Sequence, residues 1–81
     1  MKNISIYDNG GKTVDSITVI FNDRKRVTKD GILYNWISSS ETGNGFYLHS
    51  EAMKGKHLGK KIDISKLSLP LQNKLLIELN N

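Results

Sequence analysis

The candidate residues for acid–base catalysis in this sequence are Asp8, Asp15, His49, His57 and Asp63. A catalytic pair must lie within hydrogen-bonding reach of one proton, and no spacing here forces two of them together. His49, Glu51 and His57 could meet around a metal ion, but such a site needs three or four ligands in a defined shell. A chain of 81 residues also has little room for a concave, pre-formed pocket. We therefore expect no catalysis, no cofactor and no bound metal.

The segment Gly10-Gly11-Lys12-Thr13 ends like a phosphate-binding loop. That motif requires a further glycine, separated by four residues from the Gly-Lys pair, and this chain has Ile6 there. It also requires a helix after the lysine, whose N-terminus holds the phosphates, whereas a β-branched strand follows here. We interpret Asp8-Asn9-Gly10-Gly11 as a turn, because Asn-Gly and Gly-Gly supply positive φ angles at little cost.

Two basic groups are more informative. The segment Lys54-Gly55-Lys56-His57-Leu58-Gly59-Lys60-Lys61 holds four lysines, one histidine and no acid, and its glycines allow close approach of the backbone to a phosphate. The second basic group consists of Arg24-Lys25-Arg26 together with Lys29. If both lie on one face, they could neutralise several phosphates. The candidate contacts for a partner or a nucleic acid are Arg24, Lys25, Arg26, Lys29, Lys54, Lys56, His57, Lys60 and Lys61.

Four aromatic side chains are available to stack on the bases of a single strand: Tyr34, Trp36, Phe46 and Tyr47. The alternative is a solvated charged surface with these aromatics buried in a small core. The aromatic pattern of RNA-recognition domains and the GXXG clamp are both absent. Both interpretations stay open at the level of sequence.

The elements that would position these groups are mostly strands. Residues 2–7 and 16–21 predict two strands that share a buried face, formed by Ile4, Ile6, Ile17, Val19 and Phe21. Residues 22–25 predict a turn, 26–28 a short strand, and Lys29-Asp30-Gly31 a hairpin turn. A further strand is expected at 32–38 and an edge strand at 61–64, with a Ser- and Gly-rich loop at 38–45.

Two helices are expected. Phe46–Met53 is assigned to a short middle helix. The C-terminal helix has Ser68 as N-cap and Pro70 in its first turn, and its apolar face recurs at the 3.6-residue period through Leu71, Leu75, Leu76 and Leu79. Ile77 lies off that face, either as an ordinary exposed residue or as a candidate apolar contact for a partner. The expected fold is α+β: one domain over residues 1–81, with a small twisted antiparallel sheet of three to four strands, the short middle helix, and the C-terminal amphipathic helix packed on the sheet.

Composition indicates where in the cell the protein is expected. The chain has no cysteine, which favours an intracellular protein, since small secreted domains usually carry disulfides. No signal peptide or membrane span is recognisable, so we expect a cytoplasmic protein without membrane contact. The net charge is +4, which permits nucleic-acid binding without requiring it.

Several segments resemble a group of small bacteriophage and prophage proteins. These are Tyr7-Asp8-Asn9-Gly10-Gly11-Lys12-Thr13, Ser38-Ser39-Ser40, Gly45-Phe46, His57-Leu58-Gly59-Lys60 and Leu69-Pro70, in that order. The chain departs from the group at Ser16, where arginine is usual, and at Glu41-Thr42, where a loop containing proline is usual. The resemblance implies a phage origin and transfers no catalytic residue.

Three functions follow as hypotheses. The first is a phage-encoded accessory protein that binds a host or phage protein, either as an inhibitor of host defence (in the manner of an anti-CRISPR protein) or as a host-takeover factor. The second is a small basic nucleic-acid-binding module, and the third is a virion structural component. A homodimer would be one way to cover a free sheet edge.

Overall fold

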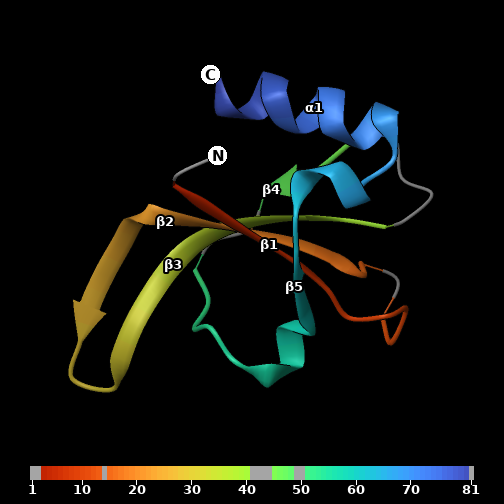
Figure 1. The fold of residues 1–81 in the computed structure, drawn as a ribbon. Coiled ribbons are helices and arrows are strands. Elements are labelled where there is room, and N and C mark those ends of the chain that lie inside the picture. Colours follow the sequence, from red (N-terminus) through yellow and green to blue (C-terminus); the bar gives the residue numbers. More distant parts are fainter. Residues whose placement is uncertain (1–2, 14, 41–44, 49–50, 81) are drawn as a thin grey trace.

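The computed structural model describes residues 3–13, 15–40, 45–48 and 51–80, and its backbone forms one sheet with one α-helix (Figure 1). The strands are β1 (Ile4–Asp8), β2 (Ile17–Thr28), β3 (Gly31–Ser39), β4 (Tyr47–Leu48) and β5 (Lys60–Ile62), and the helix is α1 (Leu69–Leu79). Two 3-10 turns, η1 (Lys56–Leu58) and η2 (Ile64–Lys66), flank β5. The predicted α+β class, with an antiparallel sheet and a C-terminal helix, is confirmed.

The sheet has the strand order β4-β3-β2-β1-β5, and every neighbouring pair is antiparallel. Four strands have three or more residues and β4 has two. In the pairing of β1 with β2, Ile4 lies opposite Phe21 and Ile6 opposite Val19. Because successive side chains alternate between the faces of a sheet, the five residues expected on one buried face do share it.

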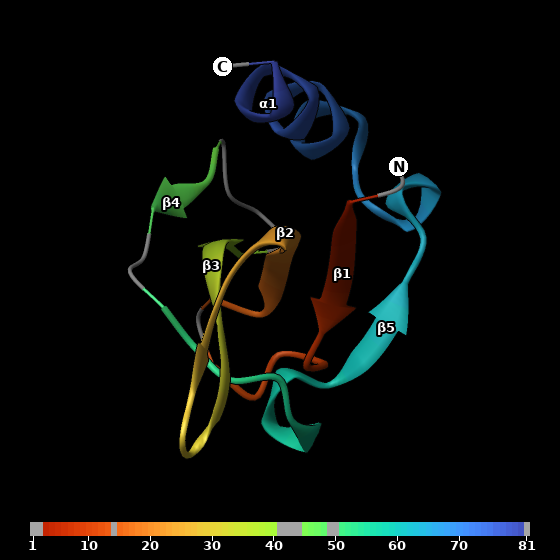
Figure 2. The same cartoon turned by 90° about the vertical axis from the view of Figure 1, so that its left-hand side faces the viewer.

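The core lies between this face and α1, which covers it (Figure 2); we call it the helix face. The helix contributes Leu71 and Leu75, both almost fully buried, and the segment before it contributes Leu67. Burying a side chain of this size contributes about 1.5–3 kcal/mol to stability. The buried cluster on this side consists of Ile4, Ile6, Ile17, Val19, Phe21, Ile37, Leu67, Leu71 and Leu75.

The hairpin of β2 and β3 extends beyond this core as an arm, which we define as residues 25–34. In both ribbon views it points away from α1 (Figures 1 and 2). The predicted turn at residues 22–25 is wrong: β2 continues through it, with a shift of register from Ile20↔Trp36 to Lys25↔Tyr34. Residues 21–24 therefore lie opposite Asn35 alone, and a bulge of this kind bends a strand and increases its twist.

The turn at the tip of the arm was predicted correctly. Thr28 pairs with Gly31, which leaves Lys29 and Asp30 as the two-residue loop. Gly31 has a φ of 140°, a conformation that residues with a side chain rarely adopt.

The predicted middle helix at Phe46–Met53 is wrong. Tyr47 and Leu48 form β4 beside Ser38 and Ile37 of β3, and Ala52 forms a bridge with Tyr34. The edge of β3 has backbone N–H and C=O groups that need hydrogen-bond partners. If residues 46–53 formed a helix, these groups would stay unpaired, so pairing with the edge overrides the weak local preference for helix. Ser38 and Ser39, predicted to begin a loop, are fully buried at the end of β3.

The predicted C-terminal helix is confirmed. Ser68 is its N-cap, with its Oγ accepting a hydrogen bond from the Leu71 backbone N at 3.4 Å. One expected core residue, Leu76, is instead 41% exposed, because the helix meets the sheet through positions four residues apart, Leu71 and Leu75. Ile77 is exposed, as expected. Within the described residues, no helix has the length and apolar character needed to cross a membrane.

Candidate functional site

Two of the predicted acid–base residues stabilise turns. The Asp8 Oδ1 accepts a hydrogen bond from the Gly10 backbone N at 2.8 Å. The Asp63 Oδ2 accepts one from the Ser65 backbone N at 3.0 Å and so caps η2. That backbone hydrogen bond is the main cause that holds the pKa of the Asp63 carboxyl below its usual range. Local turn formation accounts for both carboxylates.

The other candidates are not brought together as a metal or catalytic centre. His57 and Asp15 are both exposed at the walls of one pocket, and His49 lies outside the described residues. Among the residues that the structure describes, no three His, Cys, Asp or Glu side chains are placed to hold a metal ion. Of the possible ligand set His49, Glu51 and His57, His49 is outside the described residues and Glu51 bonds to Arg26.

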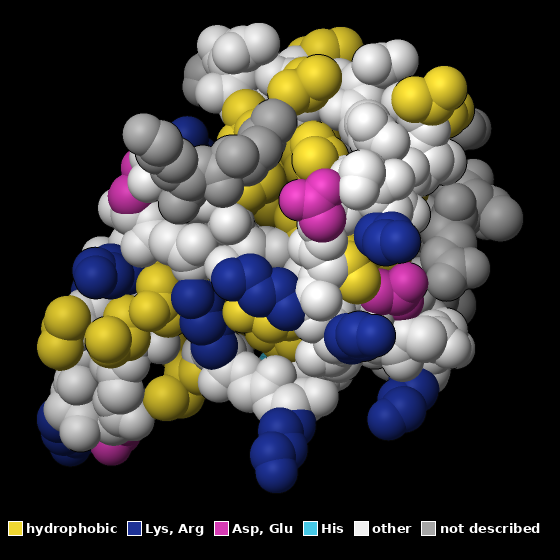
Figure 3. All heavy atoms as spheres, in the orientation of Figure 1, with side chains coloured by type: hydrophobic (Ala, Val, Ile, Leu, Met, Phe, Trp, Pro, Cys, Tyr) yellow, Lys and Arg dark blue, Asp and Glu magenta, His cyan; other side chains and the backbone are white. Residues whose placement is uncertain are grey.

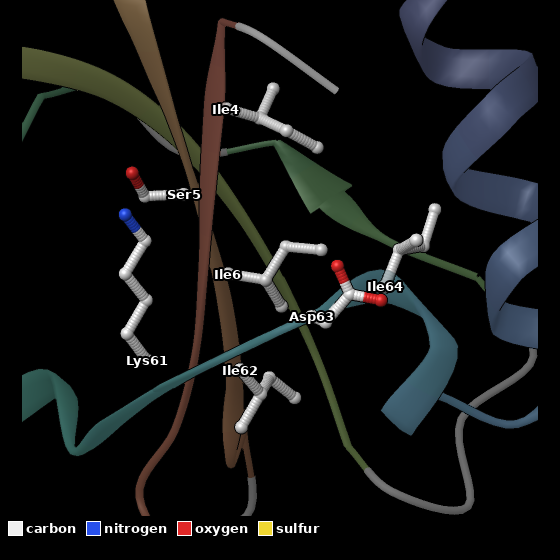
Figure 4. A pocket seen from close by; sticks show the side chains of 7 residues that line it. All are labelled: Ile4, Ser5, Ile6, Lys61, Ile62, Asp63 and Ile64. Carbon is white, nitrogen blue, oxygen red and sulfur yellow. The ribbon is translucent and has the colours of Figure 1, made fainter.

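A smaller pocket, of about 170 Å³, lies at the edge between β1 and β5 (Figure 4). The pairing of these strands ends at Ile6↔Ile62, and beyond it the chain turns into η2. In the close-up, the isoleucines point to one side of β1 while Ser5 and Lys61 point to the other (Figure 4). The lining residues are Ile4, Ser5, Ile6, Lys61, Ile62, Asp63 and Ile64. Asp63 is already engaged as the cap, so this pocket is best explained by the divergence of two strands.

The structure separates the basic residues of the arm and its base. Arg24 lies at the bulge with its guanidinium 4.6 Å from the centre of the Phe21 ring. Arg26 forms an ion pair with Glu51, whose Oε1 is 2.9 Å from the Arg26 Nη2, with a second hydrogen bond of 3.3 Å from Nε to Oε2. That hydrogen bond lowers the pKa of Glu51 and raises the pKa of Arg26. Lys29 stands in the turn at the tip.

Lys54 joins the two basic groups in part. Its Nζ donates a 2.6 Å hydrogen bond to the Asn22 Oδ1 and lies 4.6 Å from the centre of the Tyr34 ring. Lys25 is the cross-strand partner of Tyr34. Tyr34 thus has one lysine over its ring and another opposite it in β2, 29 residues apart in the sequence. All three lie on the sheet face turned away from α1, which we call the far face.

The rest of the second basic group is spread along the chain. Lys56 and His57 are exposed in η1. Lys60 and Lys61 lie in β5 opposite Asp8 and Tyr7, and because they are successive strand residues they point to opposite faces. The two basic groups thus meet on the far face at Lys25 and Lys54, and Lys61 points to this same face beside Ser5, whereas Lys60 points to the opposite face (Figure 4).

An exposed apolar group on the arm was not foreseen from the sequence. Val27 is 74% exposed, its cross-strand partner Ile32 37% and Met53 43%. The Met53 side chain packs against Gly31 at the tip. We call these three residues the arm patch, and the space-filling view shows hydrophobic side chains gathered on the arm beside Lys and Arg (Figure 3). The available signal was Val27 opposite Ile32 in a hairpin too far from the core for either to be buried there.

The four aromatic side chains also separate. Phe46 packs against the core, Tyr47 is exposed on β4, and Tyr34 carries Lys54 on its ring. Trp36 is half-buried and lines the pocket that also contains His57 and Asp15. One continuous stacking platform of all four is therefore not formed.

Comparison with known proteins gives no match: no family model fits the sequence, and neither the curated proteins nor the solved structures include a significantly similar chain. The resemblance to phage proteins stays a prediction.

Proposed function

We propose that this protein acts by binding a partner protein through the arm patch and, as its resemblance to phage proteins implies, that it is a phage-encoded accessory protein. The observation that carries the proposal is the exposure of Val27, Ile32 and Met53 on a projecting hairpin. Scattered exposed apolar residues are ordinary, but here Val27 and Ile32 form a cross-strand pair, and Met53 packs against Gly31, the residue next to Ile32. Exposed apolar groups with a polar surround are typical of protein interaction sites.

The arm suits this role physically. A two-stranded hairpin is barely stable alone, and the ion pair of Arg26 with Glu51 and the bridge of Tyr34 with Ala52 brace it against the following segment. The arm is thus held in position while its apolar side chains stay in solvent. An inhibitor of host defence or a host-takeover factor needs only such a blocking contact.

The test is capture of partners by the tagged protein from a nuclease-treated lysate of the cell in which it is made, with two matched variants. The Val27→Ser, Ile32→Ser variant removes the cross-strand pair of the arm patch, and the Leu69→Ser, Ile77→Ser variant removes exposed apolar groups of α1 instead. We expect a defined protein that the arm variant captures about tenfold less well, equivalent to about 1.4 kcal/mol. If the arm variant and the α1 variant capture the same amount of this protein, the proposal is wrong. If only the α1 variant captures less of it, the partner binds to the surface around Ile77.

Nucleic-acid binding is the second candidate, favoured by the placement of Lys25 and Lys54 around Tyr34. Affinity for an oligonucleotide should then fall by about 0.7–0.9 log units per log unit of salt for each phosphate neutralised. The Lys25→Glu, Lys54→Glu variant should lose binding, with Lys74→Glu on α1 as the control. Absence of binding at low salt excludes this function.

A further inference from the structure

A pocket of about 430 Å³, larger than the one between β1 and β5, lies on the far face. Pockets that hold ligands are typically about 300–1,000 Å³ and mostly apolar. Three parts of the chain that are distant in sequence form it: the connection between β1 and β2, the middle of the sheet, and the segment after β4. The lining residues are Asn9, Thr13, Asp15, Thr18, Trp36, Ala52, His57 and Leu58.

This pocket adjoins the arm. Ala52 bridges Tyr34 through backbone hydrogen bonds of 2.9 Å in both directions, and Trp36 follows Tyr34 on the same face of β3. Since residues two apart on a strand are separated by about 6.6–6.8 Å, the path from Ile32 through Tyr34 to Trp36 is about 13 Å long. An extended segment of four or five residues would reach from the arm patch to the pocket.

The charged side chains beside Tyr34 on this path are both lysines, and Asp30 lies further out, in the turn at the tip. Lys25 lies opposite Tyr34 in β2 and Lys54 lies over its ring, both on the far face. Glu51 bonds to Arg26, which follows Lys25 in the strand and so points to the opposite face. At the pocket end the order reverses, because Asp15 is in the wall. A bound segment should therefore carry its negative charge beside Tyr34 and place a neutral group in the pocket.

We propose that the pocket takes one large apolar side chain from an acidic, extended segment of the partner protein. Its carboxylates lie against Lys25 and Lys54, and a further apolar residue lies on Val27 and Ile32. This inference rests on the proposed function, which it deepens by naming the chemistry of the partner. A nucleic acid fits less well, because its regular phosphates would pass Asp15 and because Lys54 already occupies one side of the Tyr34 ring.

The pocket contains its own reporter, since Trp36 is the single tryptophan of the chain. The probe is a synthetic ten-residue peptide with four glutamates, one leucine and one phenylalanine, titrated while Trp36 emission is recorded. Three comparison ligands are the same peptide with alanine for phenylalanine, the same peptide with lysines for glutamates, and a ten-residue oligothymidylate. We expect saturable binding of the acidic phenylalanine peptide, with the two altered peptides binding about tenfold less tightly.

Variants test the two halves of the contact. Ala52→Phe fills the pocket, and Thr13→Phe does so from the opposite wall if the first variant disturbs the pairing with Tyr34. Lys25→Glu, Lys54→Glu removes the cations, and Lys74→Glu is the control. Filling the pocket or reversing the two lysines should weaken the probe peptide about tenfold, while the control leaves its affinity unchanged.

The inference is overturned by an unchanged Trp36 emission up to about 1 mM peptide, by equal affinity for the alanine peptide, or by tighter binding of the oligothymidylate. Capture of a partner that still depends on Val27 and Ile32 would then leave the proposed function standing. If that capture fails as well, both are wrong.

Discussion

The helix face and the far face of this sheet are built for different tasks. On the helix face, six strand residues and three residues of the C-terminal segment form one buried cluster. On the far face, a single segment that contains η1 covers the middle of the sheet, where Leu58 is buried, and the arm extends beyond it with Val27 in solvent. The contrast shows that the larger apolar cluster lies on the helix face, whereas the far face is buried only in its middle, around Ile20 and Leu58, and leaves the arm exposed.

The largest effect should come from the helix face. Leu75→Ala removes a side chain with no exposed area and should lower the free energy of unfolding by about 2–5 kcal/mol. Val27→Ala, on the arm, should change it by about 0.5 kcal/mol or less. Urea denaturation of both variants measures the difference. A comparable loss for both would mean that the arm belongs to the stable core and would break the comparison.

The next effect concerns the segment that contains η1, which covers the middle of the far face. Gly59 has a φ of 93°, and a Cβ there would meet the backbone of Asp8 and Asn9. Gly59→Ala should therefore cost about 1–3 kcal/mol for the backbone conformation alone, and more for the collision. Gly55→Ala is the matched control, because Gly55 is extended and a Cβ there meets only the His57 ring. Similar unfolding midpoints for both variants would show that the segment around Gly59 does not pack tightly against Asp8 and Asn9.

A smaller effect is expected at the start of α1. Ser68→Ala removes the oxygen that accepts from the Leu71 backbone N and should cost about 1 kcal/mol. Ser68→Asn retains an acceptor and should restore most of the loss. Thermal unfolding monitored by circular dichroism compares the three proteins. If Ser68→Asn is as unstable as Ser68→Ala, the cap is not what begins the helix.

The smallest effect concerns the ion pair of Arg26 with Glu51, which ties the arm to the segment after β4. Because the hydrogen bond from Arg26 lowers the pKa of Glu51, this contact stabilises the fold above the ordinary Glu value of 4.5 and the contribution is lost as pH falls through the lower folded value. The urea midpoints of Glu51→Gln and the parent chain should thus differ slightly at pH 7, and the difference should shrink as the pH falls below the ordinary Glu value. Glu78→Gln on α1 is the control. A difference that grows at low pH would reverse the assigned sign.

Prediction from sequence succeeded where local signals and burial agree. The alternation of Ile4 and Ile6, the β-branched run at 17–21, the Asp-Gly turn and the Ser68 cap each act within a few residues, and all were found as expected. It failed at 22–25 and 46–53, where polar turn residues and a mixed apolar pattern suggested breaks and a helix. At 46–53 the edge of β3 offered pairing partners, and at 22–25 the strand continues because Lys25 and the residues after it pair with β3 beyond the bulge. A partner distant in sequence leaves no local pattern.

The candidate site divides in the same way. The sequence by itself determined the basic groups, the exposure of Ile77 and the helix that covers one face, because charge and periodicity are written along the chain. Only the tertiary structure decided that Lys54 meets Tyr34, that Glu51 neutralises Arg26, and that Trp36 lines a pocket beside the arm patch. These contacts join residues separated by 20 or more positions, and their formation depends on the bulge in β2 and on the edge pairing of Ala52.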